Sequence, residues 1–450
     1  MEAAAAGREG SGGVRVAADP LGHGSCLLAT RSFAPGEVVL REEPAHVLAE
    51  PPQSLRPELL QAVVTASGMP PEAEMARRIA SILDLWLRSS DAERTELRSM
   101  FGGAADGPMA EFVGELMGSV QKDHPALAGC SVADLTHVVL VWLLSAHTTD
   151  EGSAVFTIGH RCNHSCLPNV AFAPAGNTLV FRALRTIQSG EPIHSAYLVG
   201  RELVAPRRVR QRLLAMRKSF DCRCERCKTE HDGAEPGRAL PCACGGQTRR
   251  VAPGSWRCDA CASKAPPTAQ VLEQEEALVD AALSGAPTAA SVDNADRWKG
   301  HWATAAALWT DAVEKLRGGV ERGDKERARS AFPLVVDYFA WVEDRWPSAR
   351  FFVSAQAAEV FACLSAMGSA EAAVIASRVC SRYLAALEHE FGVDDADNVR
   401  MRAFIRGHCG QCGQKSSSCC SRCQLVSYCS RECQKKDWKT HKKVCKTLTC

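Results

Sequence analysis

The chain has 450 residues, of which 46% are hydrophobic and 23% are charged, and its formal net charge at pH 7 is +1. This composition is too apolar and too neutral for a disordered chain, and the length predicts about two to four packed units. The near-neutral charge provides no general attraction to nucleic acid or to membranes.

Residues 1–13, MEAAAAGREGSGG, lack both a basic leader and an apolar stretch, so we expect a disordered tail and no signal peptide. No run approaches the roughly 18 apolar residues of a membrane span. The 22 cysteines, without a secretory signal, indicate thiolate metal ligands in a reducing compartment. We therefore expect a cytoplasmic or nuclear protein that does not enter membranes.

The first half of the chain predicts strands followed by helices. Residues 14–50 alternate apolar and polar positions around a glycine-containing loop, which is typical of strands. Residues 51–150 are mostly helical by pattern, for example at 75–90 and 134–147.

Residues 151–230 combine strands with a short run of polar and sulfur-containing residues, NHSCLPNV at 163–170. The segment 177–198 predicts a strand, a turn and a second strand ending at Tyr197, which is the only tyrosine before Tyr338. A basic helix is expected at 201–219.

Two clusters of cysteines follow. FDCRCERC places Cys222, Cys224 and Cys227 together, one ligand short of a tetrahedral zinc site. Residues 231–268 predict a zinc ribbon; its ligands would be Cys242, Cys244, Cys258 and Cys261. The Cys-x-Cys spacing of Cys242 and Cys244 is shorter than the Cys-x-x-Cys spacing usual in zinc knuckles, so a ribbon without metal is an alternative.

Residues 269–405 are poor in cysteine and predict helices joined by glycine-containing turns. Within them, 353–392 has the pattern of a helix-turn-helix hairpin like those of tetratricopeptide (TPR) repeats. No 34-residue repeat is evident, so a generic helical bundle is an equal alternative.

The last segment, 406–450, carries four closely spaced ligand pairs. They are Cys409 and Cys412, Cys420 and Cys423, Cys429 and Cys433, and His441 and Cys445. Each pair can aim both ligands at one tetrahedral ion, so the eight fill two closed zinc sites. A module of about 40 residues cannot build a real core, so metal binding would supply its folding free energy. The alternative is unbound cysteines packed as small apolar side chains, and Cys419 and Cys450 fall outside the pattern.

The spacing of this segment, with CxxxCQxxDWxxHxxxC from Cys429 to Cys445, resembles the MYND zinc finger. The resemblance implies cross-braced binding, in which pairs one and three share one zinc and pairs two and four the other. It also implies proline-rich peptides as partners.

The segment NHSCLPNV resembles the NHSCxPN signature of SET-domain lysine methyltransferases, and FxCxCxxC at 220–227 resembles their post-SET zinc motif. In that family the cysteine of NHSC completes the zinc site, which implies the ligand set Cys166, Cys222, Cys224 and Cys227. Residues 19–44 resemble the opening SET strands, whose glycine loop approaches S-adenosylmethionine.

The SET resemblance implies transfer of a methyl group from S-adenosylmethionine to lysine side chains of proteins, with histones among the candidate substrates. It implies Tyr197 as the catalytic tyrosine and a set of cofactor-binding residues, namely Gly22, His23, Gly24, Asn163, His164 and Phe220. As alternatives, Tyr197 is an ordinary strand tyrosine, Asn163 and His164 are turn residues, and Phe220 belongs to the core.

Taken together, the segments resemble the SET and MYND domain-containing (SMYD) family, with the finger at the C-terminus instead of within the SET domain. The expected fold is α+β and multidomain. A β-rich SET domain (14–50 and 151–230) carries a helical insertion (51–150) and a post-SET zinc site, followed by the ribbon, the helical TPR-like region and the MYND finger.

Three residues depart from the family pattern. Pro192 replaces an acidic residue, His160 stands where a small residue is common, and Lys218 stands where a second channel tyrosine is frequent. The alternative function is therefore an adaptor or transcriptional co-regulator that recruits partners through the MYND and helical regions. We expect a monomer. We also expect no binding to nucleic acid, because we interpret the six lysines from Lys435 to Lys446 as a solvent-exposed helix face.

Overall fold

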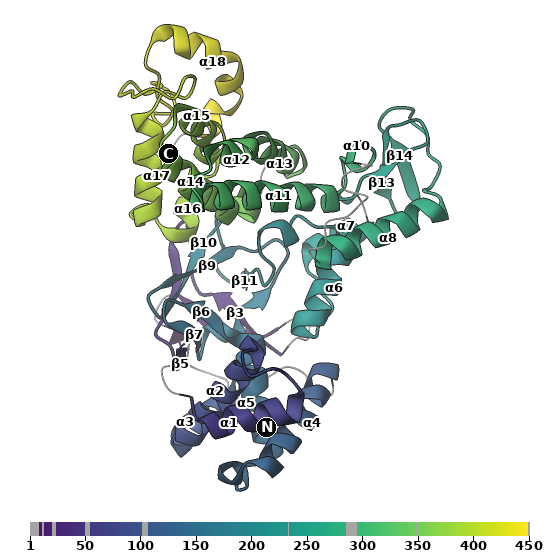
Figure 1. Ribbon diagram of the computed structural model, residues 1–450, viewed down its shortest axis with the longest axis vertical. Helices are drawn as coiled ribbons and strands as arrows, with labels where there is room; N and C mark the ends of the chain where they lie inside the picture. The colour runs from purple at the N-terminus through teal and green to yellow at the C-terminus, as the bar shows by residue number, and fades with distance from the viewer. Residues whose placement is uncertain are drawn as a thin grey trace. The chain divides into compact units, whose positions relative to one another are not determined.

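The computed structural model describes residues 9–10, 13–19, 24–49, 55–100, 107–232, 234–284, 295–346 and 350–448 (Figure 1). The chain divides into two compact units, Met1–Tyr197 with Arg212–Cys222, and Leu198–Gln211 with Arg223–Cys450. Among the described residues, no helix has both the length and the apolar character needed to cross a membrane.

The strands of the first unit form three sheets, each built from segments far apart in the sequence. The largest has the order β1 (Glu9–Gly10), β2 (Val14–Ala18), β3 (Ser25–Ala29), β11 (Pro192–Ser195) and β8 (Asn163–His164). The second has the order β4 (Val38–Glu42), β10 (Thr178–Ala183) and β9 (Val170–Ala175), and the third β5 (His46–Ala49), β7 (Gly152–Val155) and β6 (His147–Thr149).

The apolar faces of these strands enclose one core. It includes Leu27, Phe33, Leu40, Phe156, Phe181 and Ile193, all almost fully buried. Alternation of side chains places every second strand residue on this face, which is why the pattern of the sequence predicts these strands. Packing of strands from both ends of the unit holds 14–50 and 151–197 together.

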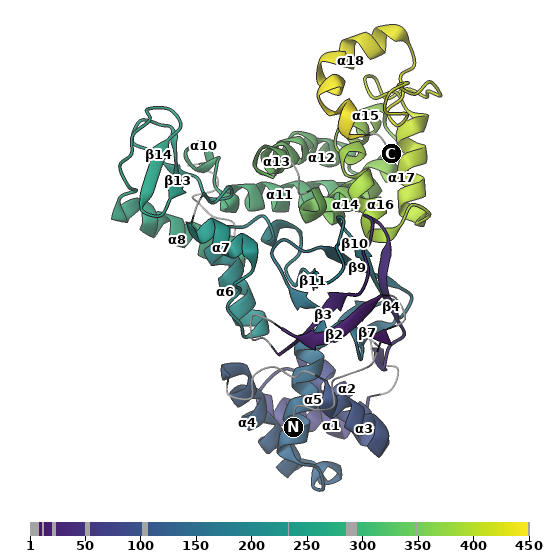
Figure 2. The same cartoon turned by 180° about the vertical axis from the view of Figure 1, so that it is seen from behind.

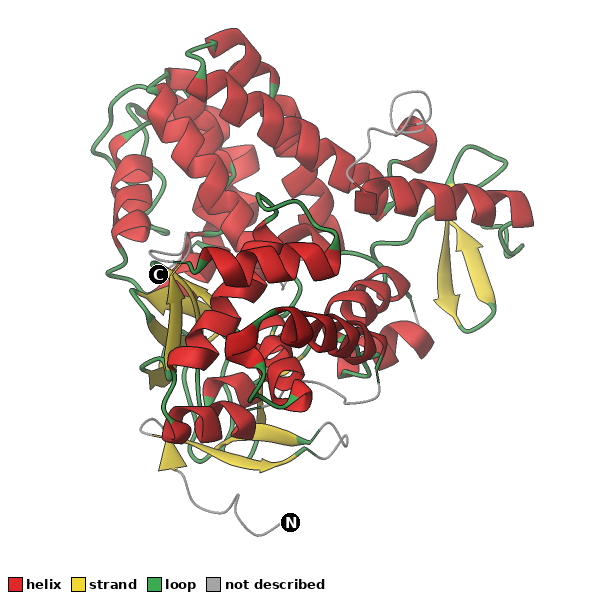
Figure 3. Ribbon diagram, turned by 60° about the horizontal axis from the view of Figure 1, so that its bottom comes forward, coloured by secondary structure: helices red, strands yellow, loops and turns green. Residues whose placement is uncertain are grey.

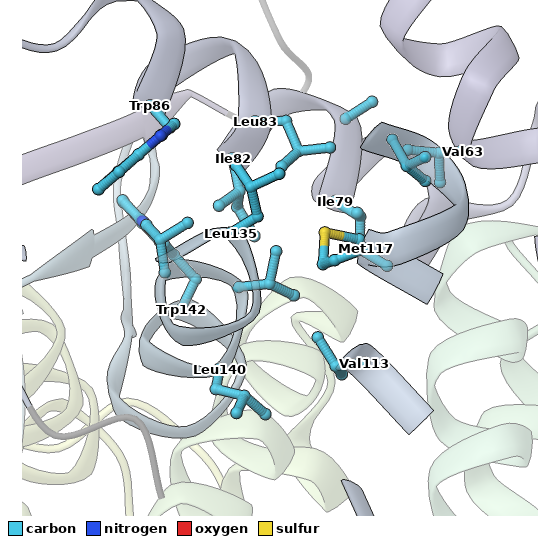
Figure 4. Packing of buried hydrophobic residues seen from close by; sticks show 14 of the residues in the cluster. Val63, Ile79, Ile82, Leu83, Trp86, Val113, Met117, Leu135, Leu140 and Trp142 are labelled. Atoms are coloured by element: carbon cyan, nitrogen blue, oxygen red, sulfur yellow. The ribbon is translucent and has the colours of Figure 1, made fainter. Parts of the chain in front are cut away.

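The five helices described between the strands form a separate bundle in the same unit. They are α1 (Pro57–Ser67), α2 (Glu74–Arg88), α3 (Asp91–Ser99), α4 (Pro108–Asp123) and α5 (Val132–Ser145), with the short 3-10 helix η1 (Pro125–Leu127) after α4. Figure 4 shows how Ile82, Leu83 and Trp86 of α2 lie toward Leu135 and Trp142 of α5. Ser90 and Glu93 form a capping box that begins α3.

Three expectations about element boundaries are wrong in detail. Glu9 and Gly10 belong to β1 and pair with β2, although 1–13 was expected to be a disordered tail; backbone pairing needs no apolar composition. The helix expected over 134–147 ends at Ser145, because Ala146 is extended and His147 begins β6. The strand expected to end at Tyr197 ends at Ser195, so Tyr197 lies just beyond the sheet.

The second unit is mainly helical. Figure 3 colours the helices of the whole chain red and the strands yellow. Helix α6 (Arg207–Lys218) is divided, with residues 207–211 in the second unit and residues 212–218 in the first. After α7 (Glu225–Asp232), three antiparallel strands form the expected ribbon: β12 (Leu240–Pro241), β13 (Gln247–Ala252) and β14 (Ser255–Cys258). The helices that follow are α8 (Ala269–Ser284), α10 (Ala295–Trp298), α11 (Trp302–Glu321), α12 (Lys325–Ser330), α13 (Phe332–Arg345), α14 (Ser354–Met367), α15 (Ala370–Arg378), α16 (Leu384–Phe391) and α17 (Ala396–Gly407).

Within this array, α14 and α15 form the helix-turn-helix expected at 353–392. Gly368 ends α14 in the left-handed conformation (φ 60°), and Ser369 caps α15. The more specific likeness to tetratricopeptide repeats stays a prediction.

The C-terminal finger packs against α15 in the second unit (Figure 2). A Cβ at Gly410 would lie 2.8 Å from the Ser377 Oγ, and one at Gly413 (φ +75°) would overlap the Ala370 carbonyl oxygen. The backbone of the finger therefore approaches α15 closely, and at Gly413, where the contact is with backbone and φ is positive, only glycine fits. Helix α18 (Arg431–Val444) completes the finger.

Candidate active site and zinc centres

Three aromatic side chains of the first unit gather beside the parallel pair β8 and β11. The His164 ring centroid lies 5.3 Å from that of Tyr197 and 6.0 Å from that of Phe220, and the Tyr197 and Phe220 rings meet edge to face at 6.2 Å. His164 pairs with Ser195 across the sheet, which brings the chain two residues later, at Tyr197, beside the imidazole. Three of the residues expected in the site therefore lie together.

The Tyr197 hydroxyl has a defined position. It donates a hydrogen bond of 2.9 Å to the Cys162 carbonyl oxygen, and the backbone N–H of Tyr197 donates to His164 Nδ1, also at 2.9 Å. Burial, and then the Cys162 thiol, raise the pKa of the Tyr197 hydroxyl above its usual range. The phenol therefore stays protonated and can donate a hydrogen bond at neutral pH.

Asn163 joins the NHSC segment to the N-terminal strands. Its side-chain amide donates to Asp19 Oδ2 at 2.8 Å and to the Ser25 carbonyl oxygen at 3.1 Å. Nearby, Gly24 has a φ of +86°, and a Cβ there would meet no described atom within 4 Å. The backbone is therefore open on one side at Gly24, as close approach by a cofactor requires. The other two loop residues expected to bind cofactor, Gly22 and His23, lie outside the described residues.

Two supporting side chains were not singled out from the sequence. Asn169, buried at the end of the NHSC segment, donates to the Pro192 carbonyl oxygen (2.8 Å) and accepts from the His194 N–H (2.8 Å). Glu42 accepts the N–H groups of Ile158 and Gly159 at 2.8 and 2.7 Å. Asn169 stands inside the NHSCLPN motif, which was a usable signal, whereas the role of Glu42 depends on a partner more than a hundred residues away.

The residues that depart from the family pattern lie in this unit. His160 is buried, its Nδ1 lies 2.7 Å from the Phe156 carbonyl oxygen, and its pKa falls to about 4 because of burial and then Arg161. It is therefore neutral. Pro192 lies in β11 opposite Leu28. Lys218 lies beside the Tyr197 ring, with its Nζ 5.6 Å from the ring centroid.

Among the described residues, fifteen cysteines and His441 form four groups of four ligands, and the groups are those expected. In each, the ligand atoms lie within 4.8 Å of one another: Cys166, Cys222, Cys224 and Cys227; Cys242, Cys244, Cys258 and Cys261; Cys409, Cys412, Cys429 and Cys433; Cys420, Cys423, His441 and Cys445. The last two groups have the cross-braced arrangement of pairs one with three and two with four.

The distances within these groups fit zinc and exclude disulfides. A Zn–S bond of about 2.3 Å places the sulfurs of a tetrahedron about 3.8 Å apart, whereas a disulfide needs about 2.05 Å. The Sγ atoms of Cys166 and Cys222 lie 3.9 Å apart, and those of Cys242 and Cys261 lie 3.8 Å apart. In the finger, Cys423 Sγ lies 3.7 Å from His441 Nε2. Four thiolates, or three with one imidazole, are the donor sets of structural zinc.

One histidine connects a zinc group with the aromatic cluster. Because His164 Nδ1 accepts the Tyr197 N–H, the ring proton lies on Nε2, which faces the Cys166 Sγ at 3.3 Å. A thiolate that receives such a hydrogen bond is held in orientation, as in many metal sites. Both ring nitrogens of His164 are thus used within the protein, so any contact with a cofactor would involve its backbone or its ring face.

Comparison with known proteins identifies two domains. Residues 24–198 match the SET domain family, and residues 409–445 match the MYND finger family. The chain is 34% identical over 86 residues to SET domain-containing protein L678 of Acanthamoeba polyphaga mimivirus, covering 19% of this chain and 32% of the viral protein. It is 37% identical over 84 residues to the human protein-lysine N-trimethyltransferase SMYD5, covering 18% of this chain and 20% of the human protein.

Among solved structures, that of Rubisco LSMT bound to AdoMet aligns with 72% of this chain and 77% of its own, at 12% identity and a TM-score of 0.30. The matched segments span a third or less of the two relatives named above. The chain thus combines a SET domain with a MYND finger, which confirms the resemblance to SET and MYND domain-containing proteins.

Proposed function

We propose that the protein transfers a methyl group from S-adenosylmethionine to the side-chain amine of lysine in other proteins. The observation that supports this most is the grouping of Asn163, His164, Tyr197 and Phe220 around β8 and β11, within a SET domain. These residues come from three sequence segments, and the fold brings a phenol, an imidazole and a phenyl ring together there.

The residues fit the cofactor in two respects. Gly24 leaves its backbone open to approach, and the half-buried Phe220 ring offers an apolar surface for an adenine or a lysine methylene chain. When bound, S-adenosylmethionine would supply an electrophilic methyl group on a positively charged sulfur. Transfer forms an N–C bond with the amine lone pair, and the broken S–C bond leaves its electron pair on sulfur.

The acceptor amine must lose its proton first. With an ordinary lysine pKa of about 10.4, deprotonation near pH 7.4 costs about 4 kcal/mol. The Tyr197 hydroxyl, fixed by the Cys162 carbonyl, would orient the amine lone pair toward the methyl group. The aromatic cluster would exclude water and so reduce the cost of the neutral amine.

The zinc groups have structural roles in this proposal. All four ligands of each would come from the protein, which leaves no open position for substrate. Because Cys166 follows His164 by two residues, zinc bound at Cys166 would hold the NHSC segment and, through His164, the Tyr197 backbone.

A second role, recruitment of partners, is favoured by the finger. Trp438 is 42% exposed on α18, with Lys435 and Lys442 one helical turn away on the same face. We propose this face as the site for a proline-rich peptide, because an exposed indole packs well against proline rings. We also propose that the protein works in the cytosol or nucleus, where thiols stay reduced.

The test is methyl transfer from tritiated S-adenosylmethionine to core histones and to a cell lysate. Incorporation into lysine, identified by mass spectrometry, is the expected result. Calorimetry with S-adenosylhomocysteine is the control for the alternative, since an adaptor with a non-functional SET domain should bind no cofactor. Cofactor binding without any labelled product would refute the enzymatic proposal.

A further inference from the structure

Lys218, the last residue of α6, is a half-buried cation beside Tyr197. Its Nζ donates a hydrogen bond of 2.6 Å to the Leu144 carbonyl oxygen and lies 5.6 Å from the centroid of the Tyr197 ring. A carbonyl oxygen and the face of an aromatic ring both stabilise an ammonium group over a neutral amine. These two contacts therefore offset part of the hydration that the ammonium group loses on burial.

Among the residues that the structure describes, no ion pair joins Lys218 to a carboxylate, and no carboxylate shifts its pKa. The titratable groups that act on it are Arg78 of α2 and His147 of β6, and both interactions are repulsive. Burial, and then Arg78, lower the pKa of Lys218 to about 8, while burial, and then Lys218, lower that of His147 to about 4. At neutral pH, Lys218 is thus mostly charged and His147 is neutral.

We propose that Lys218 lowers the pKa of the acceptor lysine, so that the amine reaching Tyr197 is neutral. This inference rests on the proposed methyl transfer. Two ammonium groups that meet in a poorly solvated site repel each other, and the one with fewer stabilising contacts loses its proton. Lys218 has the Leu144 carbonyl and the Tyr197 ring, so the proton leaves the acceptor amine and passes to solvent before the N–C bond forms.

The electrostatic effect is large enough to matter. Unit charges about 6 Å apart at a protein-like dielectric constant shift a pKa by roughly one to two units. This would supply a good part of the roughly three units that separate an ordinary lysine pKa from neutral pH. This effect also gives a reason for a lysine at position 218, because burying its ammonium group costs free energy.

The test compares the pH dependence of kcat/KM for the wild type, Lys218→Met and Lys218→Arg between pH 6 and 10. The acceptor is a pool of short peptides, each with one lysine. Methionine removes the charge, so the midpoint of the acid limb should rise by about one pH unit and the rate at pH 7 should fall about tenfold. Arginine keeps the charge and should keep the midpoint near that of the wild type. Lys122→Met removes an exposed lysine of the same unit and should change nothing.

A second measurement separates this inference from the proposed function. The pKa of a 13C-labelled lysine side chain in the same peptides is followed by NMR in the presence of S-adenosylhomocysteine. A bound-lysine pKa that is lower with the wild type than with Lys218→Met supports the inference even if no methyl is transferred. An equal pKa with both proteins, or a loss of rate in Lys218→Met that is uniform across pH, would overturn it and leave Lys218 a structural residue.

Discussion

Replacing Tyr197 with phenylalanine should separate the chemistry of the site from its stability. The variant loses one hydrogen bond, from the hydroxyl to the Cys162 carbonyl oxygen at 2.9 Å. The net cost of such a bond is about 1 kcal/mol, equivalent to about 3 °C in the melting temperature of a unit of this size. The loss of a positioned polar group beside the reacting atoms should reduce kcat about a hundredfold.

The other tyrosines provide matched controls. The hydroxyls of Tyr338 and Tyr383 are buried and have no hydrogen-bond partner among the described residues. Phenylalanine at either position should therefore leave methyl transfer unchanged and should not lower the melting temperature, because no hydrogen bond is lost. Tyr428 donates to Asp437 at 2.7 Å within the finger, so Tyr428→Phe should lower stability without lowering kcat.

The assay is methyl incorporation under saturating cofactor, with melting followed by scanning calorimetry. Preserved folding together with the hundredfold loss would support a catalytic hydroxyl. Activity of Tyr197→Phe within about threefold of the wild type, at equal folded fraction, would refute the reasoning, because the geometry would then serve only the fold.

Three further outcomes follow from the metal groups, a buried carboxyl and the packing of the finger. Native mass spectrometry should find four zinc ions per chain in the wild type and three in Cys409→Ser. The control variant Cys419→Ser, which changes a cysteine outside the ligand groups, should keep four zinc ions. Equal zinc content in both variants would contradict the assignment. Burial raises the pKa of Glu390 to about 7 in the folded protein, above the unfolded value of about 4.3, so its contribution to stability is lost as pH rises from about 4 to 7. Glu390→Gln should therefore melt higher than the wild type at pH 8 but not at pH 4, as calorimetry at the two pH values can check. Gly413→Ala should release the finger from α15 without loss of zinc, because the new Cβ would overlap the Ala370 carbonyl. The expected result is faster amide hydrogen exchange in both segments. An unchanged exchange rate would show that the backbone can move aside.

Much of the candidate site could be predicted from the order of local motifs. The ligands of the finger and ribbon lie close together in the sequence, and spacing alone limits which of them can share an ion. The NHSC segment and the downstream cysteines are more than fifty residues apart, and it was the resemblance to SET domains that implied Cys166 as the fourth ligand; the Cys166 and Cys222 sulfurs lie 3.9 Å apart.

Contacts between distant segments depended on the tertiary structure. The parallel pairing of β8 with β11 places His164 beside Tyr197, and the end of α6 brings Lys218 to the Tyr197 ring. Neither contact follows from the periodicity of the sequence, because each joins segments that are far apart along the chain. The hydrogen bonds of Asn169, the pairing of β1 and the close packing of Gly413 on α15 are of the same kind. The sequence alone thus determined which residues can bind metal and which phenol is available, since these depend on residue type and local spacing. Only the tertiary structure decided that the Tyr197 ring lies beside the half-buried ammonium group of Lys218, because that depends on which distant segments the fold packs together.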